Sequence, residues 1–125
     1  QYNIALFGAG RLGQAVASSA VFADHGFTIA AVFDVDPAKV GAQIGRNHVR
    51  PYSELESVLR EHSVTIAVLA VPATAAQRVA SDVIDAGIRI IFNYSEALIQ
   101  APAEVTVHTS NPAAELLHAL YFSLA

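Results

Sequence analysis

A glycine-rich segment near the start of the chain has the spacing of a phosphate-binding loop. Gly8, Gly10 and Gly13 fit the pattern G-x-G-x-x-G, after a strand-like apolar run and at the start of a helix-like one. In that setting the first glycine permits a tight turn, the second lets the backbone approach a pyrophosphate, and the third lets helix and strand pack closely. The helix start adds free N–H groups and a partial positive charge. We therefore expect a dinucleotide pyrophosphate here, bordered by Arg11 and Leu12.

An acidic residue after the next strand-like run completes this pattern. Asp34 lies about 20 residues beyond the last glycine, where a carboxylate accepts hydrogen bonds from the adenine ribose in NAD-binding folds. It would repel the 2′-phosphate of NADP by about 4 kcal/mol per unit charge at about 4 Å and a surface-like dielectric. The next residue, Val35, offers no compensating arginine. The sequence therefore favours NAD(H) over NADP(H).

Two further residues near this loop have alternative interpretations. Asp36, followed by Pro37, is interpreted as the cap of a short helix rather than as a ligand. Arg11 either reaches the pyrophosphate or is a solvated residue of the first helical turn, and the sequence leaves both open.

The elements that would position these residues alternate between strand and helix. Strand-like runs rich in Val, Ile and Phe occupy residues 3–7, 27–33, 65–71 and 88–93. Helices are expected from about 11 to 25, from 37, from a Ser53–Glu56 capping box to about 62, and over 74–86. This order predicts one α/β domain over residues 1–125, a Rossmann-like doubly wound, mainly parallel sheet with helices on both faces.

The C-terminal part predicts an edge strand at 105–109 and a last helix from about 112 to 124, capped by Asn111. Leu116, Leu117, Leu120 and Tyr121 form adjacent pairs that point about a quarter-turn apart, so the helix is apolar on more than one face. It is either tucked under its own sheet or buried against a second subunit.

The expected nicotinamide end of the site lacks an evident proton-transfer residue. We expect Ala70, Val71 and Pro72 after one strand, and Asn93 and Tyr94 after the next, to line it. Its conceivable acid–base groups are Tyr94 and Glu96, each interpreted as structural. Lys39 is the single lysine and falls on the adenine side, where we expect it to contact the cofactor. The sequence therefore predicts binding without turnover, and no enzyme.

Composition narrows the class of protein further. The chain is 54% hydrophobic and 14% charged, as suits a sheet buried on both faces. It has no cysteine, no apolar run long enough to span a bilayer and no signal peptide, so we expect a cytoplasmic location. The net charge is −4 with seven scattered basic residues, which predicts no DNA binding by this part alone. Neither histidines nor carboxylates have metal-ligand spacing.

Several segments together resemble the NAD(H)-binding domain of the redox-sensing transcriptional repressor family Rex. They are Gly8–Ala15 (GAGRLGQA), Phe33–Gly41 (FDVDPAKVG), Val71–Gln77 (VPATAAQ) and the stretch from Ala86-Gly87-Ile88 to Asn93-Tyr94. The resemblance covers nearly the whole chain. It implies an NAD(H) sensor domain that reads the NADH/NAD+ balance, and a homodimer through the last helix. It also implies a winged-helix DNA-binding domain ahead of Gln1, which fits a chain without methionine.

This chain departs from the resemblance at a few positions. Rex proteins often have Asn-Phe-Ala-Pro where Asn93, Tyr94, Ser95 and Glu96 stand. Some have Asp at the position of Asn111, or Tyr where Ser19 falls. Two other functions stay open: the cofactor half of an NAD-dependent oxidoreductase, and a CoA-binding module, against which the Asp34 charge argues because CoA carries a 3′-phosphate.

Overall fold

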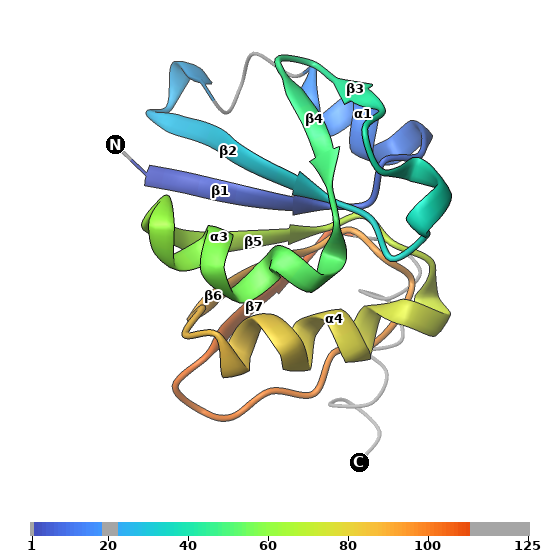
Figure 1. Cartoon of the computed structure of the whole chain (residues 1–125). Coiled ribbons are helices and arrows are strands. Elements are labelled where there is room, and N and C mark those ends of the chain that lie inside the picture. Colours follow the sequence, from blue (N-terminus) through green and yellow to red (C-terminus); the bar gives the residue numbers. More distant parts are fainter. Residues whose placement is uncertain (1, 19–22, 111–125) are drawn as a thin grey trace.

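The described residues form a central, mainly parallel sheet, as predicted. The computed structural model describes residues 2–18 and 23–110. The strands of this part are β1 (Tyr2–Phe7), β2 (Phe27–Phe33), β3 (Gln43–Ile44), β4 (Asn47–Arg50), β5 (Val64–Leu69), β6 (Ile90–Asn93) and β7 (Thr106–Thr109). They form one sheet in the order β3-β4-β2-β1-β5-β6-β7 (Figure 1). The strand order reverses beside β1, as in a doubly wound fold.

The pairings confirm the predicted fold class. β1 pairs in parallel with both β2 and β5, and β6 pairs in parallel with β5 and β7. The predicted strand at 105–109 is β7, which lies at the sheet edge. The carboxyl ends of β1, β2, β5 and β6 therefore meet along one edge, where an open α/β sheet binds ligands.

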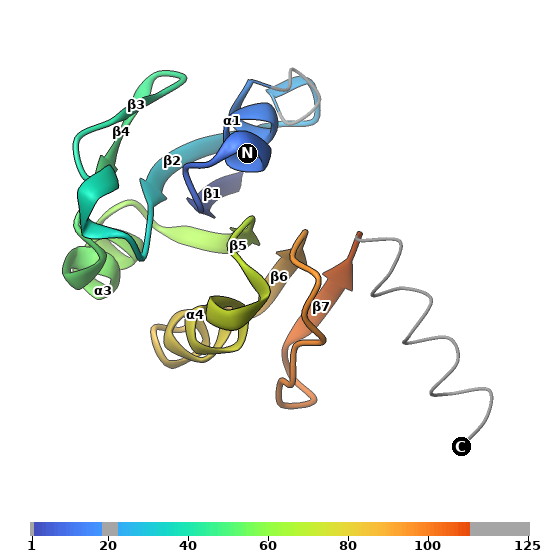
Figure 2. The same cartoon turned by 90° about the vertical axis from the view of Figure 1, so that its right-hand side faces the viewer.

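Helices cover both faces of the sheet. α1 (Arg11–Ala17) lies on one face, and α3 (Leu55–Glu61) and α4 (Ala73–Asp85) lie on the other (Figure 2). Under α3 and α4 the core contains Phe7, Phe33, Leu69 and Val79, all nearly fully buried. The α1 side has its own cluster around Leu6, Val32 and Val68. Burial on both faces explains why the strands read as continuous apolar runs.

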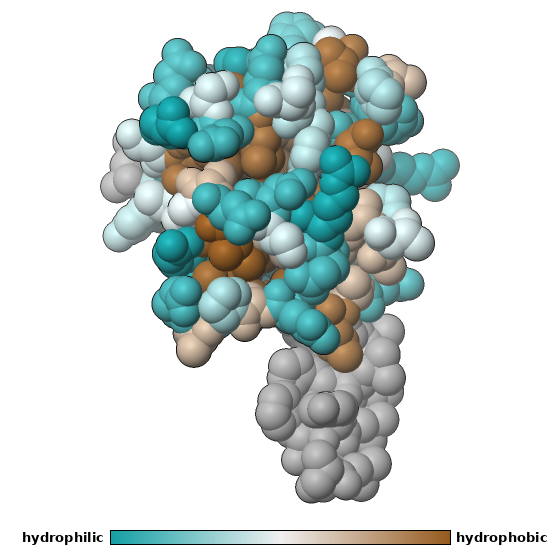
Figure 3. Space-filling model, turned by 60° about the horizontal axis from the view of Figure 1, so that its bottom comes forward, coloured by the Kyte–Doolittle hydropathy of each residue, from teal (hydrophilic) through white to brown (hydrophobic). Residues whose placement is uncertain are grey.

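The outer side of this packing faces water. Seen from the end where α4 lies, hydrophilic side chains are interspersed with small apolar areas (Figure 3). α4 shows the same division in its sequence, since Ala76, Val79, Ala80 and Val83 are buried and the residues between them are more exposed. The helix therefore uses one stripe for the core and the other for solvent.

Two predicted helix boundaries are wrong. α1 ends at Ala17 with Ser18 as its C-cap, Ala23 and Asp24 are again helical, and residues 19–22 lie outside the described part, so the predicted helix over 11–25 is not one continuous element. Serine competes for backbone hydrogen bonds and is a poor helix-interior residue. The capping box at Ser53 does not form, because η2 (Tyr52–Glu54) starts as a 3-10 turn directly after Pro51. The fixed φ of proline starts the turn earlier than the box required.

Other helix predictions are confirmed. Asp36 caps η1 (Pro37–Lys39) by accepting a hydrogen bond from the backbone N–H of Ala38. α4 matches the helix predicted over 74–86, and Gly87 follows it at φ +104°. The predicted last helix, with Asn111, and Ser19 lie outside the described residues.

The β3–β4 hairpin was not predicted. Gln43 pairs with His48 and Ile44 with Asn47, which leaves a two-residue turn that begins with Gly45 at φ +59°. A glycine at positive φ in a two-residue turn suits the twist of a hairpin. The strands are too short for a periodic signal, so the glycine was the only sequence indication. β4 also extends the parallel sheet beyond β2.

Candidate functional site

A cavity of about 690 Å³ lies at the carboxyl ends of the central strands. Gly8, Gly10, Arg11 and Leu12 line it after β1, and a second group follows β2: Asp34, Val35, Asp36 and Lys39. Residues after β5 and β6 complete the wall: Ala70, Val71, Pro72, Ala73, Tyr94, Ser95 and Glu96. Four separate segments of the chain thus converge on one crevice at the point where the strand order reverses.

The three glycines of the motif have different steric surroundings. A Cβ on Gly8, which has φ +114°, would overlap the carbonyl oxygen of Ala70. A Cβ on Gly13 would overlap the carbonyl oxygen of Gly8 and lie 2.8 Å from its carbonyl carbon. A Cβ on Gly10 would meet no atom within 4 Å. Gly8 and Gly13 are therefore required by the fold, whereas Gly10 leaves open space in the wall of the cavity.

Asp34 ties the end of β2 to the glycine loop. Its Oδ2 accepts a hydrogen bond from the backbone N–H of Ala9 at 2.8 Å, and its Oδ1 accepts one from the N–H of Asp36, also at 2.8 Å. Both carboxylate oxygens are therefore oriented by the backbone. Each carboxylate oxygen can accept more than one hydrogen bond. Both oxygens can therefore still accept hydrogen bonds from ribose hydroxyl groups.

The cavity wall after β2 has mixed charge. Asp34 and Asp36 carry two negative charges, and Lys39 brings one positive charge from the end of η1. Val35 lies between the two carboxylates along the chain and supplies an apolar surface. This arrangement suits an uncharged ribose and base better than a phosphate.

The opposite end of the cavity is shaped by Asn93 and Ser95. The Asn93 side chain is fully buried, donates to the carbonyl of Ala97 at 2.8 Å and accepts from both the N–H and the Oγ of Ser95 at 2.9 and 2.6 Å. Tyr94 N–H donates to the carbonyl of Leu69 at 2.8 Å. These bonds fix the turn after β6 and place Tyr94, Ser95 and Glu96 on the cavity wall.

Most residues expected to contact the cofactor lie together. The cavity is lined by Gly8, Gly10, Arg11, Leu12, Asp34, Val35, Lys39, Ala70, Val71, Pro72 and Tyr94. Gly13 and Asn93 do not line it, since one is packed against Gly8 and the other is buried below the turn. The expected set did not include Asp36, Ala73, Ser95 or Glu96. Their position just after strand ends was the available signal.

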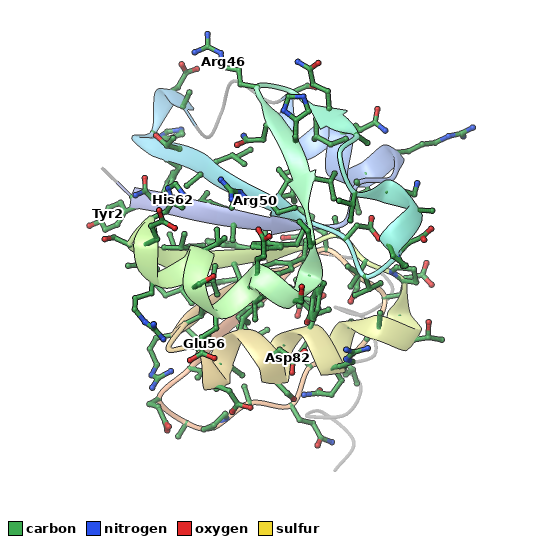
Figure 4. All side chains as sticks on the ribbon, viewed as in Figure 1. Tyr2, Arg46, Arg50, Glu56, His62 and Asp82 are labelled. Carbon is green, nitrogen blue, oxygen red and sulfur yellow. The ribbon has the colours of Figure 1, made fainter. Side chains whose placement is uncertain are left out.

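An aromatic cluster supports the site from below. Phe7 and Phe33, the last residues of β1 and β2, stack with ring centroids 5.2 Å apart. The ring of Tyr52 meets Phe7 edge-on at 6.4 Å, and its phenol donates a 2.6 Å hydrogen bond to Asp82 of α4. Burial, followed by the hydrogen bond to Asp82, raises the pKa of Tyr52 above its ordinary value of 10.0. Asp82, labelled on α4 in Figure 4, thereby connects α4 to this cluster through the hydrogen bond of Tyr52.

Histidines and basic residues in the described part gather at no single place. His25, His48 and His108 are exposed, and His62 is half-buried. Arg46 points outward from the tip of the β3–β4 hairpin, away from Arg50 at the other end of β4 (Figure 4). Residues 2–18 and 23–110 contain no group of three potential metal ligands. None of their helices is long and apolar enough to cross a membrane.

Comparison with known proteins agrees with this geometry. Residues 1–97 match the family model described as "CoA binding domain". The redox-sensing transcriptional repressor Rex of Rubrobacter xylanophilus is 46% identical over 121 residues, which is 97% of this chain and 56% of the relative. The Rex of Chloroflexus aurantiacus is 40% identical over 121 residues, 97% of this chain and 57% of the relative.

Solved structures give the same family. RSP, described as a Rex-family repressor, has a TM-score of 0.84 and 29% identity, with 98% of this chain and 58% of that chain covered. The same protein in complex with β-NADH has a TM-score of 0.83 at 29% identity, covering 98% and 59%. In complex with β-NAD+ and operator DNA it has a TM-score of 0.84 at 28% identity, covering 98% and 56%.

These matches extend over nearly all of the present sequence, but the chain spans only a little over half the length of the curated relatives. Those relatives are named as transcriptional repressors and not as enzymes. The chain belongs to the CoA-binding domain family, in the Rossmann form that Rex-family repressors contain.

Proposed function

We propose that this chain is the NAD(H)-binding sensor domain of a Rex-like redox-sensing transcriptional repressor. The observation that carries the proposal is the convergence of the glycine loop and Asp34 on one cavity at the carboxyl ends of the strands. Such a cavity is the dinucleotide site of a doubly wound fold. The complexes of RSP with β-NADH and with β-NAD+ support the choice of ligand.

The residues present fit a dinucleotide. Gly10 leaves the space that a pyrophosphate needs, because a Cβ there would meet nothing within 4 Å. The start of α1 offers backbone N–H groups without helical acceptors, and Arg11 adds a positive charge on the cavity wall. Asp34 would accept from the adenine ribose, with Val35 and Lys39 beside it. Gly13 and Asn93 would act by shaping the walls.

The nicotinamide half would lie over β5 and β6. There Ala70, Val71, Pro72 and Tyr94 line the cavity and would exclude water from one side of the ring. A nicotinamide group supplies hydride chemistry to enzymes. In this chain we propose that the residues of that wall bind and orient the ring without catalysing hydride transfer. Tyr94 and Glu96 are the titratable groups on this wall, and the close relatives are named as repressors.

Binding measurements separate this proposal from a CoA-binding function. We would titrate the purified chain by calorimetry with NADH, NAD+, NADPH and CoA. NADH should bind more tightly than NADPH and CoA, because Asp34 and Asp36 disfavour the extra phosphate on the adenosine ribose of both. Tight binding of CoA with weak or no binding of NADH would contradict the proposal.

We also propose that the chain forms a homodimer through the helix predicted at about 112–124. Phe92 packs against the α1-side cluster and stacks on His108 at 5.1 Å, and Ile90 is 37% exposed. Figure 2 shows no described helix over β6 and β7 on the α1 side of the sheet. An apolar helix of a second copy could bury this surface, and burial of three Leu-sized side chains would contribute about 1.5–3 kcal/mol each. Such a C2 interface would repeat every contact twice.

The solution mass of the chain tests the dimer. The unmodified chain should be dimeric at tens of micromolar, and the variant Leu117→Asp, Leu120→Asp should be monomeric or insoluble. Leu98→Asp is a suitable control, because Leu98 is an apolar residue with 47% relative accessibility in the loop after β6, outside the predicted helix. A monomeric unmodified chain would reject the dimer.

DNA binding is proposed to reside outside these 125 residues. The seven basic residues are scattered over the sequence, and the relatives are longer. A winged-helix domain ahead of residue 1, in a cytoplasmic protein, is the arrangement that the resemblance implies. RSP, of which this chain covers 56%, is described in complex with operator DNA, which supports a DNA-binding role for the longer protein.

A further inference from the structure

Glu96 is a carboxylate on the cavity wall for which the described structure offers no partner. It is exposed and lines the cavity after β6. The ion pairs of the described residues involve Arg50, Arg60 and Arg78, none of them with Glu96. The rest of the chain, residues 1, 19–22 and 111–125, contains no lysine or arginine. Within residues 2–18 and 23–110 the Glu96 carboxylate therefore forms no ion pair, although Arg11 and Lys39 line other parts of the same cavity.

The position of Glu96 is fixed by its neighbours. Ser95 on one side is 4% exposed and bonded to Asn93. Ala97 on the other side gives its carbonyl to the Asn93 side chain at 2.8 Å and its N–H to the Ser95 Oγ at 3.2 Å. The backbone of Glu96 is thus held between two hydrogen-bonded residues. The turn that presents Glu96 on the cavity wall is therefore fixed by hydrogen bonds.

Glu96 also lies at a defined end of the site. Asp34, after β2, marks the adenosine end, and β6 lies on the other side of β1 in the sheet order. A dinucleotide bound across the reversal of strand order places its two halves over the two halves of the sheet. The segment after β6 therefore faces the nicotinamide half, where the oxidised cofactor carries a positive charge and the reduced cofactor does not.

We infer that Glu96 is a redox-specificity residue that shifts the preference of the site toward NAD+ relative to NADH. The inference rests on the proposed dinucleotide function. The pyrophosphate charge is the same in both cofactors, so its repulsion by Glu96 cancels in the ratio of the two dissociation constants. What remains is the attraction between the carboxylate and the nicotinamide cation. Two unit charges about 7 Å apart in a water-like dielectric change an equilibrium about threefold.

The test is the ratio of the dissociation constants of NAD+ and NADH, measured by calorimetry at low ionic strength. Glu96→Gln keeps the shape and removes the charge, and should raise the ratio Kd(NAD+)/Kd(NADH) about threefold. Glu96→Lys reverses the charge and should raise it by on the order of tenfold. Both shifts should shrink in 1 M salt, where exposed charges are screened. Glu61→Gln, at the far end of α3, should leave the ratio unchanged.

The outcomes separate the possible roles of this residue. If the ratio Kd(NAD+)/Kd(NADH) of both Glu96 variants stays within about 1.5-fold of the ratio of the unmodified chain, the inference is overturned and the proposed function is left intact. The same holds if a variant loses affinity for NAD+ and for NADH equally. Equal losses would mean that Glu96 only accepts a hydrogen bond from the carboxamide, which both redox forms carry. Failure of the unmodified chain to bind either dinucleotide would overturn the proposed function, and the inference with it.

Discussion

The carboxylate of Asp34 accepts a 2.8 Å hydrogen bond from the backbone N–H of Ala9 and thereby joins the end of β2 to the glycine loop. The second carboxylate oxygen accepts from Asp36 N–H. Asp34, which we assign to the adenine ribose, is therefore also hydrogen-bonded to the loop that we assign to the pyrophosphate. A substitution by Asn removes the charge of this side chain and keeps an oxygen that can accept the hydrogen bond.

Replacing Asp34 by Asn should narrow the preference for NADH over NADPH. The amide oxygen can still accept from Ala9, whereas the negative charge that repels a 2′-phosphate is lost. We expect the ratio Kd(NADPH)/Kd(NADH) to fall by about tenfold or more, as measured by calorimetry. Asp24→Asn, at an exposed position away from the cavity, is the control. Equal affinities for the two cofactors in the unmodified chain would refute the role of Asp34.

Gly10 and Gly13 should respond differently to alanine. Gly10→Ala should change the free energy of unfolding by less than about 1 kcal/mol, because its φ is −80° and a Cβ there is unobstructed. It should weaken NADH binding by at least about tenfold, since the new methyl group fills the pyrophosphate space.

Gly13→Ala should instead destabilise the fold by about 2 kcal/mol or more, because the Cβ overlaps the Gly8 carbonyl. Urea denaturation and NADH titration of both variants check the pair. Loss of stability in Gly10→Ala with unchanged binding would show that the open space at Gly10 is not a ligand site.

Tyr52 should make stability sensitive to alkaline pH. Because burial and Asp82 raise the pKa of Tyr52 in the folded state, the folded chain favours the neutral phenol. This contribution is fully present below the ordinary pKa of 10.0 and is lost as the pH rises toward the folded-state pKa. Tyr52→Phe should cost about 1 kcal/mol at pH 7 by loss of the hydrogen bond to Asp82.

The difference between the unmodified chain and Tyr52→Phe should then decrease above pH 10. Urea denaturation at pH 7, 10 and 11 measures it, and Tyr2→Phe, at a residue 57% exposed, serves as the control. A difference that is constant over this range would contradict the role given to the Tyr52–Asp82 hydrogen bond.

The chain should not catalyse steady reduction of NAD+ by small alcohols or hydroxy acids. The titratable groups on the nicotinamide wall are Tyr94 and Glu96, and no histidine or lysine stands beside them on it. The absorbance of NADH measures turnover directly. Sustained NADH formation that disappears in Tyr94→Phe or Glu96→Gln would identify an enzyme instead.

The sequence predicted the parts of the fold whose signals are local. The glycine motif, Asp34 and the four long apolar runs each carry their own pattern, and β1, β2, β5 and β6 occur where those runs are. The hairpin of β3 and β4 was missed because two to four residues give no periodicity. The start of α3 was misplaced because the turn after Pro51 competed with the Ser53 cap.

Within the site, the sequence predicted which strand ends contribute but not which way each side chain lies. Asn93 and Tyr94 are neighbours, yet Asn93 is buried in hydrogen bonds to Ser95 and Tyr94 lines the cavity. Side chains alternate between the two faces of β6, and this alternation continues into the turn. Which residues of the turn face the crevice depends on the path of its backbone, which the sequence pattern does not give. The position of Glu96 on the cavity wall, without an ion pair among the described residues, became evident for the same reason.

The central claim is that NADH occupies the crevice between the glycine loop, Asp34 and the turn after β6. The most direct test is to add NADH to the ¹⁵N-labelled chain and follow the backbone amide resonances. The account predicts shifts at Gly8, Gly10, Leu12, Asp34 and Glu96. It predicts none in the separate cavity of about 540 Å³ lined by residues of β2 and the β3–β4 hairpin, including Ile29, Ile44, Gly45 and Asn47. Shifts confined to that second cavity, or no shifts at saturating NADH, would contradict it.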